Sequence, residues 1–337
     1  HYESCRTAFT YSNPAANTEL IFSRLTNKTL DLYCHTPYHK HVNESSIKGG
    51  LGFGTSQQMV DMYFTDKGLR IEDDPDYVEY EGIPGPEHYG WETDYNDPFN
   101  PSRNYFKKNT NKTLKQWANR EPRFYAWVGF DTGKWFNLEA TDDEYSQVLN
   151  VKVDGLAGRG MENYSVTGFY TKKLIPYELV MTQSNDTGNT CSRYAFPIIR
   201  LGDLYLLYAE CLNECKETPD AEVYEYIQKV RTKAGLDKTT GGLVNTWELY
   251  SNNPEKPKTK EGMRQIIQQE RMIELSFEGQ RFFDIRRWKT AMDWCNRPVR
   301  GWSINETGDA FYYPNYIYFQ TRKRNGVRLE RRLSKDT

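Results

Sequence analysis

The sequence predicts a mainly α-helical protein that combines a tetratricopeptide-like scaffold of helical hairpins, a large loop-rich portion and a few short β-strands. Two observations lead to this prediction. After residue 198, three long stretches repeat apolar side chains every three to four residues, which is the spacing of one helix face. Before residue 190, Gly, Pro, Asn and Asp recur every few residues, as they do in loops. We therefore divide the chain into a loop-rich part, residues 1–190, and a helical scaffold part, residues 191–337.

The loop-rich part contains only short periodic segments. Residues 56–63, "SQQMVDMY", fit a short helix that Ser56 can cap. Residues 148–153 and 169–173 fit short strands, and we expect Trp127 in the core on another strand. Residues 84–106 contain four prolines and no periodicity, so we expect a long irregular loop there.

The helical part begins with residues 198–214, "IIRLGDLYLLYAECLNE", which have the period of an amphipathic helix. Pro219 opens a second helix and Gly235 ends it. Two helices joined by a short turn form an antiparallel pair, the unit of tetratricopeptide-like stacks. A loop with two Gly and two Pro, residues 241–257, follows this pair.

A second helical pair follows the loop. Its first helix, residues 261–278, starts at Thr259 or Glu261 and stops at Gly279. Its second helix covers residues 280–290.

The C-terminal tail predicts a β-hairpin. Asn325-Gly326 lies between two runs of alternating polarity, which is a strong signal for a two-residue hairpin turn. We interpret the seven basic residues after residue 321 as a solvated surface.

Residues 270–289, "ERMIELSFEGQRFFDIRRWK", carry many charges within an apolar helical stripe. A carboxylate directed toward a core needs a partner, because an unpaired buried charge is very costly. Arginine suits this role, since its guanidinium is planar, always charged and able to bind two oxygens. We therefore predict an internal network that locks the helices together, formed by Glu270, Glu274, Arg281, Asp284 and Arg287.

Several protein classes are disfavoured. The chain has no His after His88 and no evident Ser or Cys motif with a base, so we predict no enzyme. A net charge of −2 gives no reason to expect nucleic acid as a partner. No apolar run approaches the roughly 20 residues of a membrane span. The six Cys are scattered, and Cys211 and Cys215 lack further ligands, so we expect buried thiols and no metal.

The stretch 270–289 resembles the signature near the C-terminal end of SusD/RagB-type outer-membrane nutrient-binding proteins of Bacteroidetes. Other segments resemble that family in the expected order: 17–25 ("NTELIFSRL"), 56–68 ("SQQMVDMYFTDKG"), 120–128 ("REPRFYAWV"), 197–214 and 227–236. In the third of these, Glu121 replaces the family's Asp. The family's N-terminal helices and lipidated Cys have no counterpart here, and its C-terminal Pro-Ile-Pro element is not apparent after Gly301.

The resemblance implies a cell-surface lipoprotein of the outer membrane that is anchored by a lipid and is not an enzyme. Such a protein would capture an oligosaccharide and deliver it to a SusC-like TonB-dependent transporter. The loop-rich part, residues 1–190, would face the ligand. A peptide-binding member of the same family is the alternative, and a glycoside hydrolase with two carboxylates across a cleft is a more remote one.

Candidate ligand-binding residues are aromatic side chains beside amides, since rings stack on sugars and amides bond their hydroxyls. We expect this role for Tyr89, Trp91, Tyr95, Asn96 and Trp135. The structural alternative is that these rings pin a long loop to the body of the protein.

A run of acidic residues offers a possible Ca²⁺ site, because Ca²⁺ prefers carboxylate oxygens. The run comprises Glu72, Asp73, Asp74 and Asp76, but Pro75 interrupts it and the spacing is not that of an EF-hand. We therefore favour a solvated acidic loop and expect no cofactor.

Overall fold

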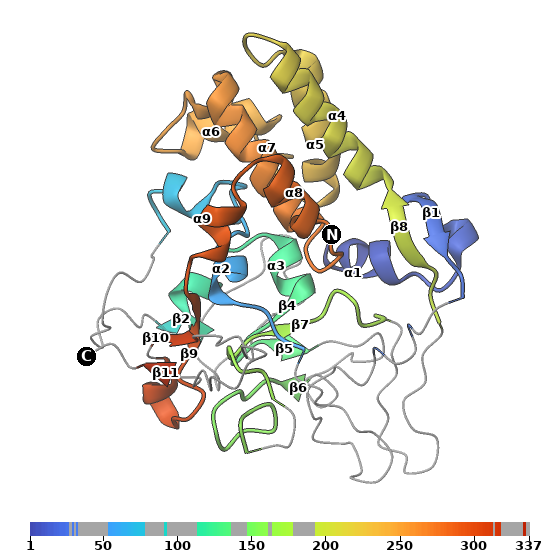
Figure 1. Cartoon of the computed structure of the whole chain (residues 1–337). Helices are drawn as coiled ribbons and strands as arrows, with labels where there is room; N and C mark the ends of the chain where they lie inside the picture. The colour runs from blue at the N-terminus through green and yellow to red at the C-terminus, as the bar shows by residue number, and fades with distance from the viewer. Residues whose placement is uncertain are drawn as a thin grey trace, which may run out of the picture.

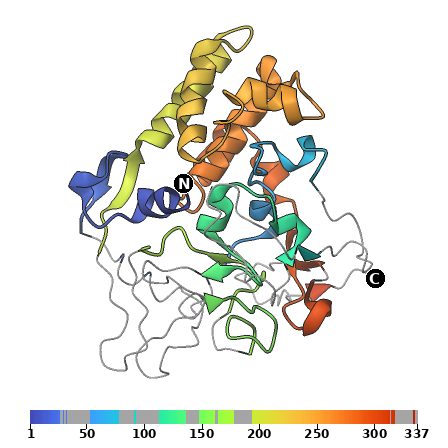
Figure 2. The same ribbon diagram turned by 180° about the vertical axis from the view of Figure 1, so that it is seen from behind.

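The computed structural model of the chain describes residues 1–26, 29, 32, 53–77, 91–92, 113–135, 147–160, 164–177, 193–312, 314–317 and 333–334. The long helices gather at one end of the molecule and most of the short strands at the other (Figure 1), and the view from behind shows the same division (Figure 2). The longest described elements are helices, so the prediction of a mainly α-helical protein is confirmed.

The scaffold is built from helices that follow one another after residue 200. They are α4 (Leu201–Cys215), α5 (Ala221–Lys233), α6 (Leu243–Tyr250), α7 (Lys260–Glu274), α8 (Arg281–Arg287) and α9 (Ala291–Cys295), with the 3-10 helix η6 (Lys256–Lys258) before α7. Helix α4 packs against both α5 and α7. Their apolar faces meet in one core that contains Leu206, Ile227, Trp247 and Ile266. The predicted pairing of the first two helices is therefore confirmed.

Local chemistry explains both ends of α5. The carboxylate of Asp220 accepts hydrogen bonds from the backbone N–H groups of Glu222 and Val223, so Asp220 is the N-cap, one residue after the predicted Pro219. At the other end, Gly235 has a φ of +91°. The Gly235 N–H donates to the carbonyl of Thr232 and the next N–H donates to Arg231, which is a Schellman motif.

Two predictions for the helical part are wrong: one helix was missed, and the end of another was misplaced. Residues 241–257 are not only a loop, because α6 begins after Gly242 and buries Leu243 and Trp247 in the scaffold core. Helix α7 ends at Glu274, before the predicted stop at Gly279. Its start is confirmed, since the Thr259 hydroxyl caps it by accepting a hydrogen bond from the Gly262 N–H.

The loop-rich part contains short elements. They are α1 (Tyr2–Thr10), η1 (Pro14–Ala16), β1 (Leu20–Arg24), α2 (Gln57–Val60), η3 (Ile71–Asp73), β2 (Trp91–Glu92), β3 (Thr113–Leu114), η5 (Lys115–Trp117), α3 (Pro122–Trp127), β4 (Val128–Gly129), β5 (Lys134–Trp135), β6 (Gln147–Val148) and β7 (Tyr170–Thr171). The predicted strand 169–173 exists as β7, shortened to two residues, whereas the predicted strand 148–153 is wrong beyond Val148, because β6 ends there and residues 149–153 form no strand. Trp127 is buried as predicted, but on helix α3, because Pro122 at the first helical position favours a helix start.

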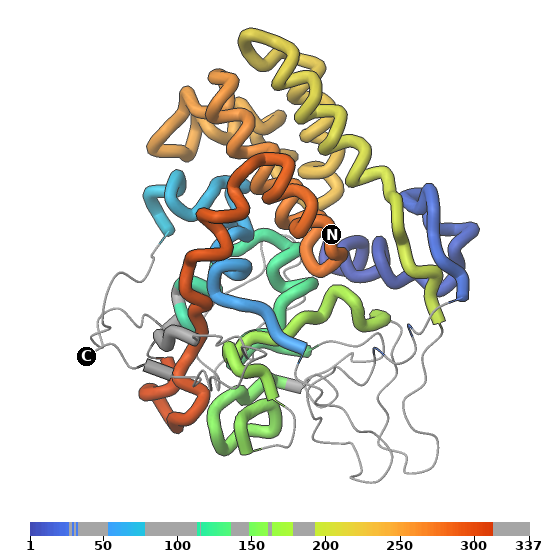
Figure 3. Tube along the Cα trace, viewed as in Figure 1, coloured from blue at the N-terminus to red at the C-terminus, as the bar shows by residue number. Residues whose placement is uncertain are grey.

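Antiparallel pairs join segments that are distant in sequence. Strand β1 pairs with β8 (Phe196–Arg200), β2 with β3, β4 with β7, and β5 with β6. The tube view shows α1 and β1, in blue, beside the yellow-green strand that leads into α4 (Figure 3). The N-terminal segment is thereby attached directly to the helical scaffold.

The C-terminal segment adds a small sheet. Its strands, in the order β11-β10-β9, are β9 (Val299–Trp302), β10 (Pro314–Ile317) and β11 (Leu333–Ser334), with η7 (Gly308–Tyr312) after β9. Strands β10 and β11 are antiparallel with Ile317 opposite Leu333, a register centred on residue 325. The antiparallel pairing agrees with the predicted hairpin, whose Asn325-Gly326 turn and basic residues lie outside the described residues.

The two parts of the chain share a hydrophobic core. One cluster combines Tyr63 and Trp127 from the loop-rich part with Leu236 and Ile273 from the helical part. In the described segments, no helix has both the length and the apolar character that a membrane span needs. The prediction of buried cysteines holds for Cys5 and is wrong for three others: Cys211, Cys215 and Cys295 are exposed.

Candidate functional site

The predicted ligand-binding residues are only partly within the described residues. Tyr89, Tyr95 and Asn96 lie outside them. The backbone of Trp91 lies in β2, opposite Leu114 of β3. Trp135 is 4% exposed and belongs to the core, so the structure does not support its predicted role in stacking on a ligand.

A neighbouring glycine explains the burial of Trp135. Strand β4 passes so close that a Cβ on Gly129 would lie 2.9 Å from the indole of Trp135. The ammonium of Lys172 lies 5.5 Å from the centre of the same ring. Trp135 is thus packed between neighbouring segments instead of facing solvent.

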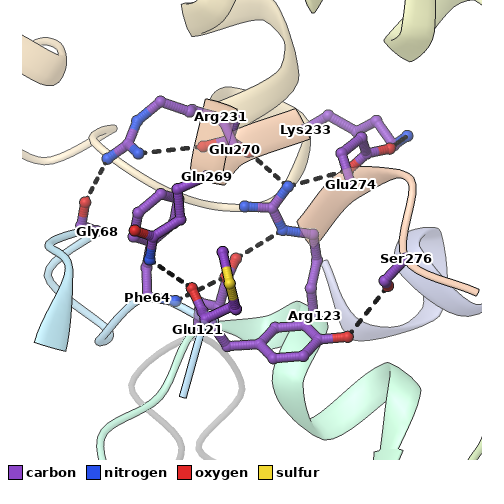
Figure 4. A network of polar contacts seen from close by, with 12 residues as sticks. Phe64, Gly68, Glu121, Arg123, Arg231, Lys233, Gln269, Glu270, Glu274 and Ser276 are labelled. Carbon is purple, nitrogen blue, oxygen red and sulfur yellow. Dashed lines mark hydrogen bonds and ion pairs between the residues drawn. The ribbon is translucent and has the colours of Figure 1, made fainter. Parts of the chain in front are cut away.

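The predicted charge network is present and also includes residues outside the stretch 270–289. Figure 4 shows Arg123 of α3 at its centre, close to glutamates of α7. The Arg123 guanidinium lies 2.6 Å from Glu121, 2.6 Å from Glu270 and 3.0 Å from Glu274. Glu270 also contacts Arg231 of α5 at 3.2 Å. Elements from both parts of the chain therefore meet at buried ion pairs.

This network is nearly balanced in charge. It contains six carboxylates and five cations among the described residues: Glu19, Glu121, Asp237, Glu270, Glu274 and Glu278, with Arg123, Lys173, Arg200, Arg231 and Lys233. Such mutual compensation is what the burial of charge requires, since each ion needs a partner in a low-dielectric interior. We interpret the network as structural.

The pKa shifts agree with this interpretation. Burial raises the pKa of Glu274, but the charges of Lys233, Arg200 and Arg123 outweigh it and hold the pKa well below its usual range. Burial also raises the pKa of Glu121, and Arg123 offsets only part of that effect. Three carboxylates thus share Arg123. Glu274 has two further cations, Arg200 and Lys233, and Glu270 also has Arg231.

A second buried network joins α4, α7 and α8. Arg271 contacts Asp203 at 2.5 Å and Asp284 at 2.8 Å. Arg287 contacts Asp284 at 2.8 Å and Glu210 at 2.6 Å. The prediction is therefore confirmed for Glu270, Glu274, Asp284 and Arg287. It is wrong for Arg281, whose guanidinium contacts the Trp294 ring and forms no ion pair with a carboxylate of the described segments.

The acidic run at residues 72–76 is held by cations. Lys67 contacts Asp74 at 2.8 Å and Asp76 at 2.5 Å, and Lys256 contacts Asp73 at 2.6 Å. Asp73 and Asp74 are buried, so the interpretation as a solvated loop is wrong for these two. No group of three or more potential ligand side chains within the described ranges could hold a metal ion.

The described residues do form a cleft, of about 380 Å³, where α7, α9 and the turn between α8 and α9 face α2, η3 and β9. That volume is within the range of small-molecule sites. Its wall is rich in amides and charges: Gln58, Asp61, Met62, Arg70, Ile71, Glu72, Gln265, Gln268, Gln269, Met272, Trp288, Thr290, Trp294, Arg297 and Arg300. We refer to it as the α7–α9 cleft.

Hydrogen bonds fix much of this wall. Gln58 accepts from the Arg300 N–H at 3.1 Å, and the Arg300 guanidinium contacts Asp61 at 2.9 Å. Gln269 donates to the carbonyl of Met62 at 2.6 Å. Among the residues that the structure describes, none forms a hydrogen bond with the side chain of Gln268. The cleft is therefore preorganised, with Gln268 left to bond a ligand.

A comparison with models of known protein families matches residues 18–331 to the SusD family. This match covers nearly the whole chain. The chain belongs to the SusD family. A SusD-like relative, P25 of Formosa agariphila, is 33% identical over 189 residues, which are 56% of this chain and 31% of the relative. SusD-like protein P2 of the same organism is 27% identical over 128 residues, or 38% of this chain and 23% of the relative.

Solved structures show the same fold. BT4246 superposes with a TM-score of 0.69 at 23% identity, over 94% of this chain and 48% of that protein. A SusD-like protein of Bacteroides fragilis, BF3747, gives a TM-score of 0.62 at 20% identity, over 96% of this chain and 52% of that protein. The chain thus spans about half the length of these solved structures and a third or less of the two relatives above.

Sequence reasoning did not find the α7–α9 cleft of this SusD-family chain. Its residues come from segments as distant as Gln58 and Arg300. One signal was present: Gln265, Gln268 and Gln269 recur at helical spacing within "RQIIQQE", so they share a face of α7. A row of amides on an amphipathic helix also suits an ordinary solvated face, and this signal alone would not have identified a site.

Proposed function

We propose that this chain binds oligosaccharide at the cell surface and delivers it to a SusC-like TonB-dependent transporter of the outer membrane. Membership of the SusD family supports a nutrient-binding accessory protein. The α7–α9 cleft, whose wall includes four glutamines and a threonine, carries the assignment to glycans. Neutral amides and hydroxyls both donate and accept hydrogen bonds, as sugar hydroxyls require.

Aromatic stacking is assigned to the stretch 84–106, not to the indoles of the cleft. Trp294 and Trp288 each carry a guanidinium over the ring. Trp91 is anchored to the body of the protein by the pairing of β2 with β3. We propose that Trp91, with Tyr89, Tyr95 and Asn96, forms a stacking platform. In this function the protein performs no catalytic step.

Calorimetry of the full-length gene product with a panel of oligosaccharides and peptides tests the proposal. We expect an oligosaccharide to bind, and Trp91→Ala to weaken its binding by roughly 1–3 kcal/mol, as for aromatic stacking on nucleobases. The matched control is Trp135→Phe, which should lower the melting temperature and leave the affinity unchanged, because Trp135 is buried.

Two results would contradict parts of the proposal. An unchanged glycan affinity in Trp91→Ala, together with a lower melting temperature, would make the stretch 84–106 structural. Binding of peptides alone would replace the glycan assignment with the peptide-binding alternative.

A further inference from the structure

Two arginines that contact Trp294, the partly buried Arg281 and the exposed Arg297 on the wall of the α7–α9 cleft, have no carboxylate partner among the described residues. The Cζ atoms of Arg281 and Arg297 lie 4.4 Å and 4.3 Å from the centre of the Trp294 ring. Both are within the range of a cation–π contact. No ion pair joins either guanidinium to a carboxylate in the described part of the chain. Two positive charges are therefore held against one indole without a counter-charge.

This arrangement is electrostatically unfavourable. Burial lowers the pKa of Arg281, and the nearby charge of Arg297 lowers it further. Like charges brought together in a partly desolvated place cost free energy unless an anion compensates them. The remaining charges of the cleft do not supply one, since Asp61 is paired with Arg300 and Glu72 with Arg70. The cleft therefore has a surplus of positive charge at the Trp294 end.

We propose that the α7–α9 cleft is a subsite for an acidic sugar, whose anionic group binds Arg297 beside Trp294, while Arg281, which contacts the same ring but does not line the cleft, adds positive charge nearby. The anionic group is either the carboxylate of a uronic acid or a sulfate ester. A guanidinium binds both with two parallel hydrogen bonds, because its planar N–H groups match the spacing of the oxygens. This inference rests on the proposed glycan-binding function and adds the ligand class to it.

The other groups of the cleft suit the rest of such a sugar. Gln268 lines the cleft without a side-chain hydrogen bond to any described residue, and Thr290, whose hydroxyl donates to the carbonyl of Ile285 at 3.4 Å, lies on the same wall. The volume of about 380 Å³ accommodates a small ligand. Arg297 is exposed, so the anionic group can reach it from solvent.

The test compares three oligosaccharides of matched length, one neutral, one containing uronic acid and one carrying sulfate esters, by calorimetry with the full-length gene product. We expect one acidic oligosaccharide to bind more tightly than the neutral one, and added salt to weaken that binding. Arg297→Gln should reduce the acidic affinity about tenfold, the range of a charge-assisted hydrogen bond, and leave the neutral affinity unchanged. The double variant, Arg297→Gln with Arg281→Gln, should lose more of the affinity for the acidic oligosaccharide than Arg297→Gln alone.

A matched control lies on the same helix as Arg281. Arg286→Gln also removes one positive charge from α8, but Arg286 donates to the carbonyl of Phe282 and its guanidinium lies over the Phe282 ring instead of Trp294. The affinity of this variant for the acidic oligosaccharide should change less than about twofold. The melting temperature distinguishes binding from stability: because Arg281 and Arg297 repel each other, their removal should leave it unchanged or raise it.

The outcomes separate this inference from the function on which it rests. Equal binding of neutral and acidic oligosaccharides would overturn the acidic subsite and leave glycan binding intact. A double variant that keeps its acidic affinity but no longer co-purifies with the transporter would assign the arginines to a protein interface and overturn the subsite. If none of the oligosaccharides binds, both proposals fail.

Discussion

Glu274 offers the sharpest test of the structural charge network. Its side chain is 1% exposed and lies 2.6 Å from Arg200, 3.0 Å from Arg123 and 3.2 Å from Lys233. Removing one partner of a buried ion pair costs about 3–5 kcal/mol. Each of the three cations keeps another carboxylate, as Arg200 keeps Glu278. We therefore expect Glu274→Gln to lower the free energy of unfolding by about 3 kcal/mol.

Urea unfolding at neutral pH measures this change, with a control on the same helix. Glu261→Gln also neutralises a glutamate that is paired with an arginine, Arg264, but the Glu261 side chain is 64% exposed. Its effect should stay below about 1 kcal/mol. Gln replaces Glu without a change in size, so the difference between the two variants isolates the burial of the charge.

The pH dependence supplies an independent check with a defined sign. The folded-state pKa values of Glu274 and Glu278 are lowered, whereas an unfolded glutamate titrates near ~4.3. Their stabilisation is thus fully present above about pH 5 and is lost as the pH falls through the folded pKa values. The raised pKa of Glu121 acts in the opposite direction. Comparing Glu274→Gln with the parent isolates Glu274, and the variant should lose less stability on acidification.

The reasoning would be refuted by one combination of results. If Glu274→Gln unfolds at the same urea concentration as the parent and with the same pH dependence, the buried network does not stabilise the fold. If it also loses ligand binding, Glu274 belongs to a binding site instead.

Two further predictions concern partnership and backbone geometry. The full-length protein, solubilised from outer membranes in mild detergent, should co-purify with a SusC-like transporter; recovery only as a free protein in several detergents would count against the partnership. Gly235→Ala should lower the free energy of unfolding by about 1 kcal/mol or more, because Gly235 has a φ of +91° and an added Cβ would lie 2.9 Å from the imidazole of His1. An unchanged urea midpoint would show that the turn after α5 tolerates a side chain.

The sequence allowed prediction of the helices with a long amphipathic period and missed a short one. Helices α4, α5 and α7 are 13 to 15 residues long, enough for several turns of the pattern. Helix α6 has 8 residues, directly after a Gly-Gly pair. Local glycines and prolines thus indicated a loop, and only burial of Leu243 and Trp247 against the scaffold explains the helix.

The charge network shows a second limit of sequence reasoning. The helical spacing of Glu270 and Glu274 indicated that both carboxylates face the core. Their partners could not be found in the same way, because Arg123 is 151 positions from Glu274 and Arg200 is 74 positions away. Sequence periodicity describes one element at a time, whereas pairing of buried charges depends on how the elements pack.

The same limit explains why the predicted ion pairing of Arg281 was wrong. The observed contact of Arg281 with Trp294 is itself informative. Buried cations of this protein are compensated in two ways: Arg123 by carboxylates, and Arg6 and Lys172 by backbone carbonyls. The partly buried Arg281, and the exposed Arg297 that contacts the same indole, have neither kind of partner in the described residues. Cations without such a partner are expected at functional sites, where a protein sacrifices some stability for binding. The pairing that holds the scaffold together is thus the reason for assigning the two unpaired arginines to a ligand.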